Sequence, residues 1–274
     1  MERYRFALRP RWILSHVLIV VLVIVMINLG FWQLRRLHEK KAYNASVRAN
    51  EAQPVQSVQD VLHPGEPVSV GHGLNFRRVT ATGTYDTSNE IIVRARSLNT
   101  EPGVWALTPL RLDDGSAVIV LRGFLPSQGT LERVPTDAEP PSGPITVTGL
   151  VQETQTAGTF EANDPANGKL TTMARVDVAR IAKQMPYPIE PAYLQLQTQQ
   201  PAQAGQQPLV VPEPVLDEGP HFSYAVQWFI FSTIAVVGYP LILRRKARDK
   251  EEADDDDEDT DEDDLQAAGV GTTT

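Results

Sequence analysis

The chain has 274 residues, a formal net charge of −9 at pH 7 and no cysteine. The absence of cysteine excludes disulfides, CxxC redox chemistry and metal sites built on thiolates. The net charge does not describe the whole chain, because thirteen of the 34 acidic residues lie between Asp249 and Asp264 and the remainder is slightly basic. We expect this acidic tail to be disordered, since like charges repel and little in it can be buried. It would either solvate the chain without a specific ligand or contact a basic cytoplasmic loop of a partner.

The first element in chain order is an apolar segment, residues 12–34, which contains no Asp, Glu, Lys or Arg. It exceeds the roughly 20 residues that a helix needs to cross a hydrocarbon core of about 30 Å. Its apolar core is longer than that of a signal peptide, and WQLRR follows it instead of a small-residue cleavage site. We therefore predict an uncleaved transmembrane helix, with a signal peptide as the alternative. No Arg- and Ser-rich transit peptide is present, which favours a bacterial cell membrane.

The middle of the chain has short runs in which β-branched and aromatic residues recur with a period of two, separated by Gly, Pro, Asn and Asp. This pattern predicts strands of an antiparallel sheet or a barrel-like β domain. The Asp-Asp-Gly sequence at 113–115 predicts a hairpin. One helix is predicted after Asp177, a suitable N-cap residue. The predicted strands are residues 76–86, 90–97, 105–112, 117–126, 145–152 and 192–198.

Two Pro-rich stretches interrupt this domain. Residues 134–144 are predicted to form a surface loop, and residues 198–220 an extended lead into the second apolar segment.

The second apolar segment, residues 221–243, is followed by the basic run RRKARDK and preceded by VLDEGPH, which has no Lys or Arg. Basic residues favour the cytoplasmic side of a span, so this asymmetry predicts a cytoplasmic C-terminus. The basic residues around the first segment are balanced and do not decide its orientation. Two spans return the N-terminus to the cytoplasm as well. Residues 1–11 and 244–274 are thus predicted to be cytoplasmic, and residues 35–220 to form an extracytoplasmic domain.

The predicted fold is a membrane α+β protein. Two transmembrane helices form a hairpin and flank a mainly antiparallel β domain with one helix. Motifs of soluble enzymes such as GxSxG, HExxH, the P-loop and GxGxxG do not occur, and no two histidines have the i, i+4 spacing of metal ligands. The chain is therefore not expected to be an enzyme, and no nucleic-acid partner is expected.

Polar and aromatic residues mark the outer ends of both predicted spans. On a helix, His221, Tyr224 and Trp228 have i, i+3, i+7 spacing and line one stripe, with Gln227 beside them. Trp and Tyr are common belt residues at membrane interfaces, whereas Gln227 lies deeper and is costly there without a polar partner. A second stripe with the same spacing occurs in the first span. We expect the two stripes to face each other if the helices pack antiparallel. The second stripe consists of Asn28, Trp32 and Arg35.

Four motifs in this order resemble the surfeit locus protein 1 family, a family of cytochrome c oxidase assembly factors. They are GFWQLRRLHEK (30–40), RRVTATGTYD (77–86), TPLRLDDGSAVIVLRGFLP (108–126) and HFSYAVQWFIF (221–231). The resemblance covers nearly the whole chain up to about Arg245, and the acidic tail lies outside it. Two positions depart from the family pattern. Phe124 stands where the family has Trp, and His38 stands where an aromatic residue is usual.

The resemblance implies a two-span membrane protein that assists the insertion of haem a into subunit I of an aa3-type oxidase, or stabilises that subunit. It implies His221 as the haem ligand, and a neutral imidazole is a suitable axial ligand for iron. Arg35 or Arg36 would pair with the propionates. Trp32, Tyr224 and Trp228 would cover the macrocycle, and Gln227 would bond a polar substituent. The implied partners are subunit I, the assembled oxidase or its supercomplex, haem a synthase and the lipid bilayer.

Two alternatives remain open at this stage. The chain could be a structural accessory subunit that braces the oxidase or its supercomplex without touching haem. An enzyme that modifies haem is less well supported, because such chemistry should need more intramembrane histidines or acidic motifs over many helices.

Overall fold

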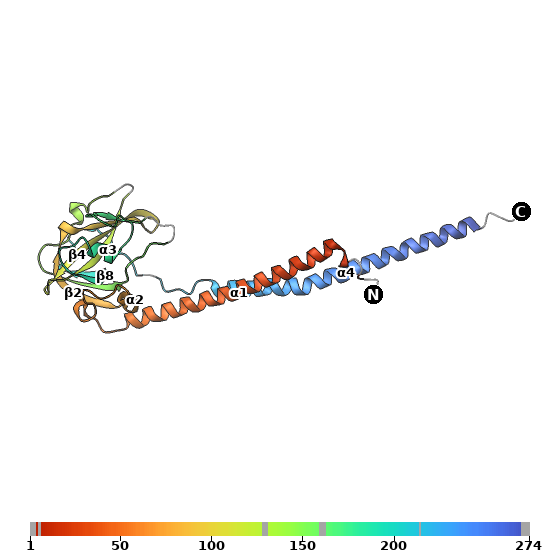
Figure 1. Ribbon diagram of the computed structural model, residues 1–274, viewed down its shortest axis with the longest axis horizontal. Coiled ribbons are helices and arrows are strands. Elements are labelled where there is room, and N and C mark those ends of the chain that lie inside the picture. The colour runs from red at the N-terminus through yellow and green to blue at the C-terminus, as the bar shows by residue number, and fades with distance from the viewer. Residues whose placement is uncertain (1–3, 5–6, 128–130, 159–162, 214, 270–274) are drawn as a thin grey trace. The chain divides into compact units, whose positions relative to one another are not determined.

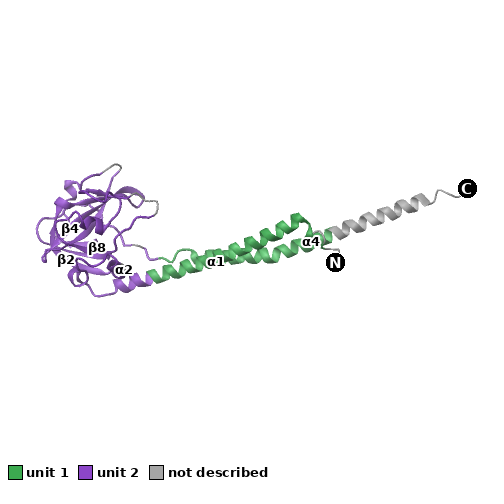
Figure 2. Cartoon of the chain, viewed as in Figure 1, with its two compact units in different colours: residues 1–43, 217–274 green, residues 44–216 purple. Residues whose placement is uncertain are grey.

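A computed structural model describes residues 4, 7–127, 131–158, 163–213 and 215–269, without the side chains of His72 and of residues 250–269. The chain forms two compact units (Figure 2). One comprises residues 1–43 and 217–274, and the other residues 44–216. The first unit is helical, and the second holds all the strands of the described residues (Figure 1).

The helical unit is built from the long helices α1 (Pro10–Glu51) and α4 (His221–Gly269). Both contain a segment that is long and apolar enough to cross a membrane, which agrees with the two predicted spans. Most of their large apolar side chains are exposed, as expected of helices whose surroundings are not water. Length and composition are the basis of this assignment.

Helix α1 continues well beyond residue 34, where the β domain was expected to begin. The residues after the apolar segment are mostly strong helix formers, and no Gly or Pro occurs until Pro54. The last turns of α1 belong to the β unit: Val47 packs with Phe76 and Leu150. Asn50 Nδ2 donates hydrogen bonds to the carbonyl oxygens of Gly73 and Asn75, at 3.1 and 2.9 Å. The β unit therefore begins at residue 44, inside a helix.

Helix α4 also continues past its apolar segment, as far as Gly269. The structure thus differs from the expected disorder of the acidic tail, whose backbone is helical up to this residue. An existing helix extends without a new nucleation step, which explains how a charged segment can continue it. Residues 270–274 lie outside the described residues.

Among its described residues, the β unit contains six long strands and two short ones. The six long strands confirm the six predicted runs, whereas the two-residue strands β1 and β7 have no sequence pattern of their own. The strands are β1 (Gln56–Ser57), β2 (Arg78–Tyr85), β3 (Ile91–Leu98), β4 (Glu101–Leu112), β5 (Ala117–Pro126), β6 (Ile145–Gln152), β7 (Thr172–Met173) and β8 (Ile189–Gln200).

Five of these strands close into a barrel in the order β2, β6, β8, β5 and β4, because β4 also pairs with β2. Within the barrel, only the β5–β8 pair is parallel, so the prediction of a mainly antiparallel, barrel-like domain is confirmed. Strand β3 extends the sheet from β4 and carries β7, and β1 pairs with β2. The closure needs Gly83, since a Cβ atom there would lie 2.0 Å from the carbonyl oxygen of Arg111.

The main core fills the barrel, with buried apolar residues from all five strands, such as Val79, Leu110, Val120, Val147 and Leu194. A second core lies between β3, β4, β5 and β8 on one side and the helix α3 (Val178–Ala182) on the other. These two cores account for the period-two patterns of the predicted strands.

The helix α3 is the predicted one. The carboxylate of Asp177 accepts a hydrogen bond from the backbone N–H of Arg180 at 2.9 Å, which confirms the predicted N-cap. The prediction of a single helix in this domain is wrong, because the five-residue helix α2 (Val70–Leu74) is also present. Its sequence, VGHGL, contains two glycines and has no helical pattern, so local propensity could not indicate it.

The hairpin predicted at 113–115 connects β4 and β5. The carboxylate of Asp114 accepts hydrogen bonds from the backbone N–H and the hydroxyl of Ser116, at 2.9 and 2.7 Å. Gly115 follows with φ +87°, a conformation that glycine adopts without strain.

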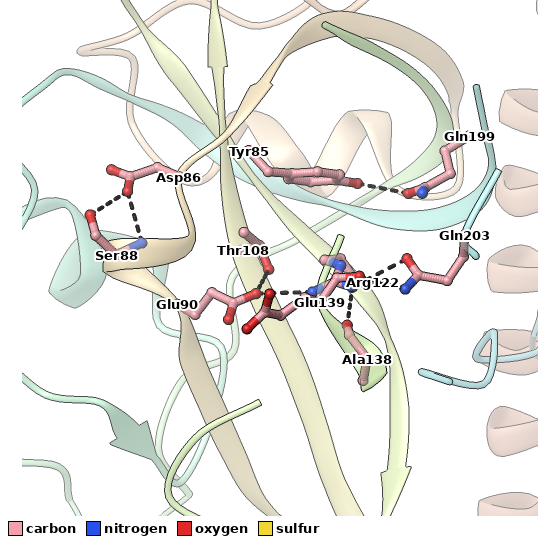
Figure 3. Close-up of polar contacts among 10 residues, drawn as sticks. All are labelled: Tyr85, Asp86, Ser88, Glu90, Thr108, Arg122, Ala138, Glu139, Gln199 and Gln203. Carbon is pink, nitrogen blue, oxygen red and sulfur yellow. Dashed lines mark hydrogen bonds and ion pairs between the residues drawn. The ribbon is translucent and has the colours of Figure 1, made fainter. Parts of the chain in front are cut away.

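A polar cluster lies beside the barrel core, around Arg122 on β5 (Figure 3). The Arg122 side chain is 1% exposed, and its Nη1 lies 2.9 Å from the Glu90 carboxylate. Thr108 donates a hydrogen bond of 2.6 Å to the same oxygen, and Arg122 Nη2 donates to the carbonyl of Ala138. Burial raises the pKa of Glu90, while the Thr108 hydroxyl and Arg122 counteract it. The hydrogen bond from Arg122 holds the loop at Ala138 against the barrel. Loss of either Arg122 or Glu90 would leave the other as an unpaired buried charge.

Candidate functional site

The two long helices meet through a histidine and a glutamine. His221, the first residue of α4, places its Nδ1 atom 2.8 Å from Oε1 of Gln33 on α1. His221 and Gln33 are both half-buried. This hydrogen bond joins the first turn of α4 to the last residues of the apolar segment of α1.

The bond determines which imidazole nitrogen can bind a ligand. An amide oxygen only accepts, so with Gln33 Oε1 in this position Nδ1 of His221 carries the proton. In the neutral ring, Nε2 then keeps its lone pair. A histidine oriented in this way is the usual form of a metal ligand, whose second nitrogen donates to a fixed acceptor.

The residue two positions before the histidine keeps the ligand side of the ring open. Gly219 has φ +66°, and a Cβ atom there would lie 3.4 Å from Nε2 of His221. A residue with a side chain would be strained at this φ, and its Cβ would be in van der Waals contact with the nitrogen. The glycine therefore serves both the turn into α4 and access to Nε2.

Close helix packing supports this end of the unit. Gly30 on α1 faces Phe229 on α4, and a Cβ atom at Gly30 would lie 2.8 Å from the phenyl ring. Phe31 packs against the same ring edge to face, with centroids 5.4 Å apart and planes at 75°. Leu37 of α1 and Ala225 of α4 are buried, with exposed fractions of 6% and 1%. Small and apolar residues thus bring the helices together next to His221.

The remaining predicted residues of α4 line its surface around this contact. Trp228 is half-buried, and its ring lies 6.2 Å from that of Phe231 in an edge-to-face arrangement. Gln227 is exposed, and Tyr224 is 47% exposed. These side chains are available to a ligand or to lipid.

The predicted residues of α1 are less closely tied to His221. Trp32 is 49% exposed. Arg35 and Arg36 are exposed too, and Arg36 forms an ion pair of 2.8 Å with Glu39. Asn28 donates a hydrogen bond of 2.8 Å to the carbonyl of Ile24 on its own helix. The expectation that the stripe of Asn28, Trp32 and Arg35 faces α4 is therefore replaced by a contact through Gly30 and Gln33.

Sequence reasoning missed Gln33 because it chose the face of α1 by matching its spacing to that of α4. A usable signal was present, since Gln33 is a polar residue three positions after Gly30, and small residues mark the faces at which membrane helices approach each other.

The other end of the helix pair has its own polar contact. The Tyr239 hydroxyl of α4 donates a hydrogen bond of 2.9 Å to Ser15 Oγ of α1, and it lies 2.6 Å from Nδ1 of His16. The pairs Gln33 with His221 and Ser15 with Tyr239 run in opposite directions along the two helices. The helices are thus antiparallel neighbours.

A metal site made by protein side chains alone is not found within the described part of the chain, where no group of three His, Asp or Glu is placed to hold an ion. The arrangement at His221 offers one nitrogen ligand. It suits a metal whose other ligands come from a macrocycle.

A model of the SURF1 family matches residues 20–233. Proteins of Mycobacterium bovis and Mycobacterium tuberculosis, both described as uncharacterized SURF1-like proteins, are 28% identical over 258 residues, which is 92% of this chain and 92% of each relative. A SURF1-like protein of Rickettsia conorii is 24% identical over 234 residues, or 84% of this chain and 92% of that protein. The family match includes Gln33 and His221 and confirms the resemblance of the four motifs. The chain belongs to the SURF1 family.

Proposed function

We propose that the protein is an assembly factor for an aa3-type cytochrome c oxidase, and that it holds haem a as cargo for subunit I. Membership of the SURF1 family supports the assembly role. One observation carries the haem role: the hydrogen bond of 2.8 Å from His221 Nδ1 to Gln33, which leaves Nε2 as a ligand.

The donor set fits a haem. His221 offers one neutral imidazole nitrogen, with no side chain at Gly219 to crowd it. The exposed aromatic rings of Trp32 and Tyr224 and the half-buried Trp228 are suited to contact the macrocycle. Exposed Arg35 is suited to bond the propionates, with Arg36 as an alternative. Gln227, also exposed, could bond a polar substituent of the ring.

A single ligand also suits a carrier that must release its cargo. Gln33 is a neutral acceptor, so it polarises the imidazole less than a carboxylate would. His221 would then hold the iron less strongly than a histidine backed by Asp or Glu. Subunit I could displace it with the stronger ligands of its own site.

The proposed setting is a bacterial cell membrane crossed twice, with both termini in the cytoplasm and the β unit outside. The partners would be subunit I, the assembled oxidase or its supercomplex, and haem a synthase as the source of cargo. The protein would act by binding and transfer, without catalysing a reaction of its own.

The test is the absorption spectrum of the full-length protein purified from cells that synthesise haem a. Wild type should carry haem a, and His221→Ala should lose it. His16→Ala is the matched control, because His16 lies on the same helix pair at the other end and should leave the spectrum unchanged. Circular dichroism would check that all three proteins fold.

Two results would contradict the haem role. Equal haem in wild type and His221→Ala would place the ligand elsewhere. A complete lack of haem in wild type, together with stable copurification with the oxidase, would favour a bracing role as an accessory subunit.

A further inference from the structure

A second candidate site lies at the opposite end of the helical unit from His221. Arg244, Arg245 and Arg248 line a cavity of about 440 Å³ together with Leu241 and Tyr4. The described residues that line it supply three guanidinium groups and no carboxylate. A hollow of this composition is suited to a phosphate, because the planar guanidinium group donates two parallel hydrogen bonds to phosphate oxygens.

The arginines share one face of α4. Leu241, Arg244, Arg245 and Arg248 have i, i+3, i+4, i+7 spacing, which places them along one side of a helix. Lys246 does not belong to this series and does not line the cavity. Three of the four basic residues at positions 244–248 therefore line the cavity, and Lys246 does not.

The start of α1 adds positive charge at the same end. Ser15 and His16 contact Tyr239, so the antiparallel helices bring the first turns of α1 level with the residues that follow Tyr239. Arg9 and Arg11 flank the first residue of α1. Their positive charges add to those of the cavity, and the acidic residues that follow on α4 from Asp249 onward oppose them.

The apolar surroundings indicate a lipid as the source of the phosphate. The arginines follow immediately after the apolar segment of α4, which ends at Leu243. Leu241 lines the cavity and is 55% exposed, while Val237 and Ile242, also on α4, are 54% and 59% exposed. A headgroup at the arginines could thus continue into acyl chains along exposed apolar side chains.

We propose that this cavity binds the phosphate headgroup of an anionic phospholipid. The guanidinium groups of Arg244 and Arg245 bond the phosphate, and the acyl chains lie against the apolar segment of α4. Basic groups next to a membrane span attract anionic lipids in general through their charge. This site differs because particular side chains form hydrogen bonds with the headgroup. The site is independent of the haem role, since it shares no residue with the surroundings of His221.

The test compares two substitutions that each remove one positive charge from neighbouring positions. Arg245→Gln alters the cavity, and Lys246→Gln leaves it intact. Full-length protein in detergent would be titrated with phosphatidylglycerol, phosphatidylcholine or inorganic phosphate, and bound lipid counted by native mass spectrometry. Wild type should prefer phosphatidylglycerol to phosphatidylcholine. Arg245→Gln should weaken phosphatidylglycerol binding about tenfold, while Lys246→Gln should change it less than about twofold.

Three outcomes would overturn the proposal. Equal losses in both variants would show that net charge alone attracts the lipid. Equal binding of the two lipids would show that the headgroup is not recognised. Competition by inorganic phosphate as strong as that by phosphatidylglycerol would show a phosphate site without a role for the acyl chains.

Discussion

The hydrogen bond between Gln33 and His221 can be tested by replacing Gln33 with Leu, which has a similar size and no acceptor. The bond is 2.8 Å long, joins two neutral groups and is half-buried. Such a bond contributes about 1 kcal/mol, which corresponds to roughly a fivefold change in an equilibrium constant. We expect Gln33→Leu to bind haem a about fivefold more weakly than wild type, because the imidazole is no longer held with Nε2 toward the ligand.

The assay is an optical titration of haem-free, full-length protein with haem a, at a pH at which imidazole is neutral. Gln33→Glu is the matched control, since it restores an acceptor of the same length. A charged acceptor forms a stronger hydrogen bond, about 1.5 to 3 kcal/mol, so this variant should bind haem at least as tightly as wild type.

The reasoning about Gln33 would be refuted if Gln33→Leu bound haem like wild type while His221→Ala did not bind it. The imidazole would then need no partner on α1. A loss as complete as that of His221→Ala would also contradict it, because one neutral hydrogen bond cannot account for so large an effect.

Three further predictions concern stability. Gly30→Leu should separate the helices and cost about 1 to 3 kcal/mol, because a Cβ atom would lie 2.8 Å from Phe229; a lower midpoint of thermal unfolding in detergent would show it. Gly83→Val should open the barrel between β2 and β4, since its Cβ would lie 2.0 Å from the Arg111 carbonyl, and hydrogen exchange at both strands should increase. Burial raises the pKa of Glu190 to about 7, above its ordinary value of 4.5, so the β unit should lose stability as pH rises through 7. Glu190→Gln should remove this loss, which is at most about 3 kcal/mol and is measurable as hydrogen exchange of β8 at pH 5 and pH 8.

Local patterns predicted most of the β unit. The alternation in Arg78–Tyr85 follows from burial of one face, whereas the apolar run Ala117–Pro126 is buried on both faces. Asp177 caps a helix through a local hydrogen bond. The strand order was not predictable in this way. The parallel pairing of β8 with β5 joins residues far apart in the chain, and nothing in the period of either strand indicates its neighbour. The strands β1 and β7 are too short to show any period.

The candidate site was also predictable only in part, because local sequence patterns do not indicate contacts between distant residues. His221 stands out as a histidine at the start of an apolar segment, and it is the first residue of the motif HFSYAVQWFIF. Its partner Gln33 depends on which face of α1 turns toward α4. That choice is made by the fit of Phe229 against Gly30, a contact between distant parts of the chain. The ion pair of Arg122 with Glu90 was not predictable either. An arginine within a strand pattern indicates an exposed position, unless the loop that covers it is known.

The position of β8 in the barrel has a consequence for how the chain matures. Strand β8 pairs with β5 on one side and with β6 on the other, and it is the last of the described strands. Until residues 189–200 have been synthesised, β5 and β6 each present an unpaired edge beside an open apolar core. Nonsense mutations upstream of β8 should therefore produce an aggregating sheet rather than a weakened protein. The last barrel strand ends only some 20 residues before α4 begins at His221. During synthesis, the barrel can therefore close only shortly before the second apolar helix is made.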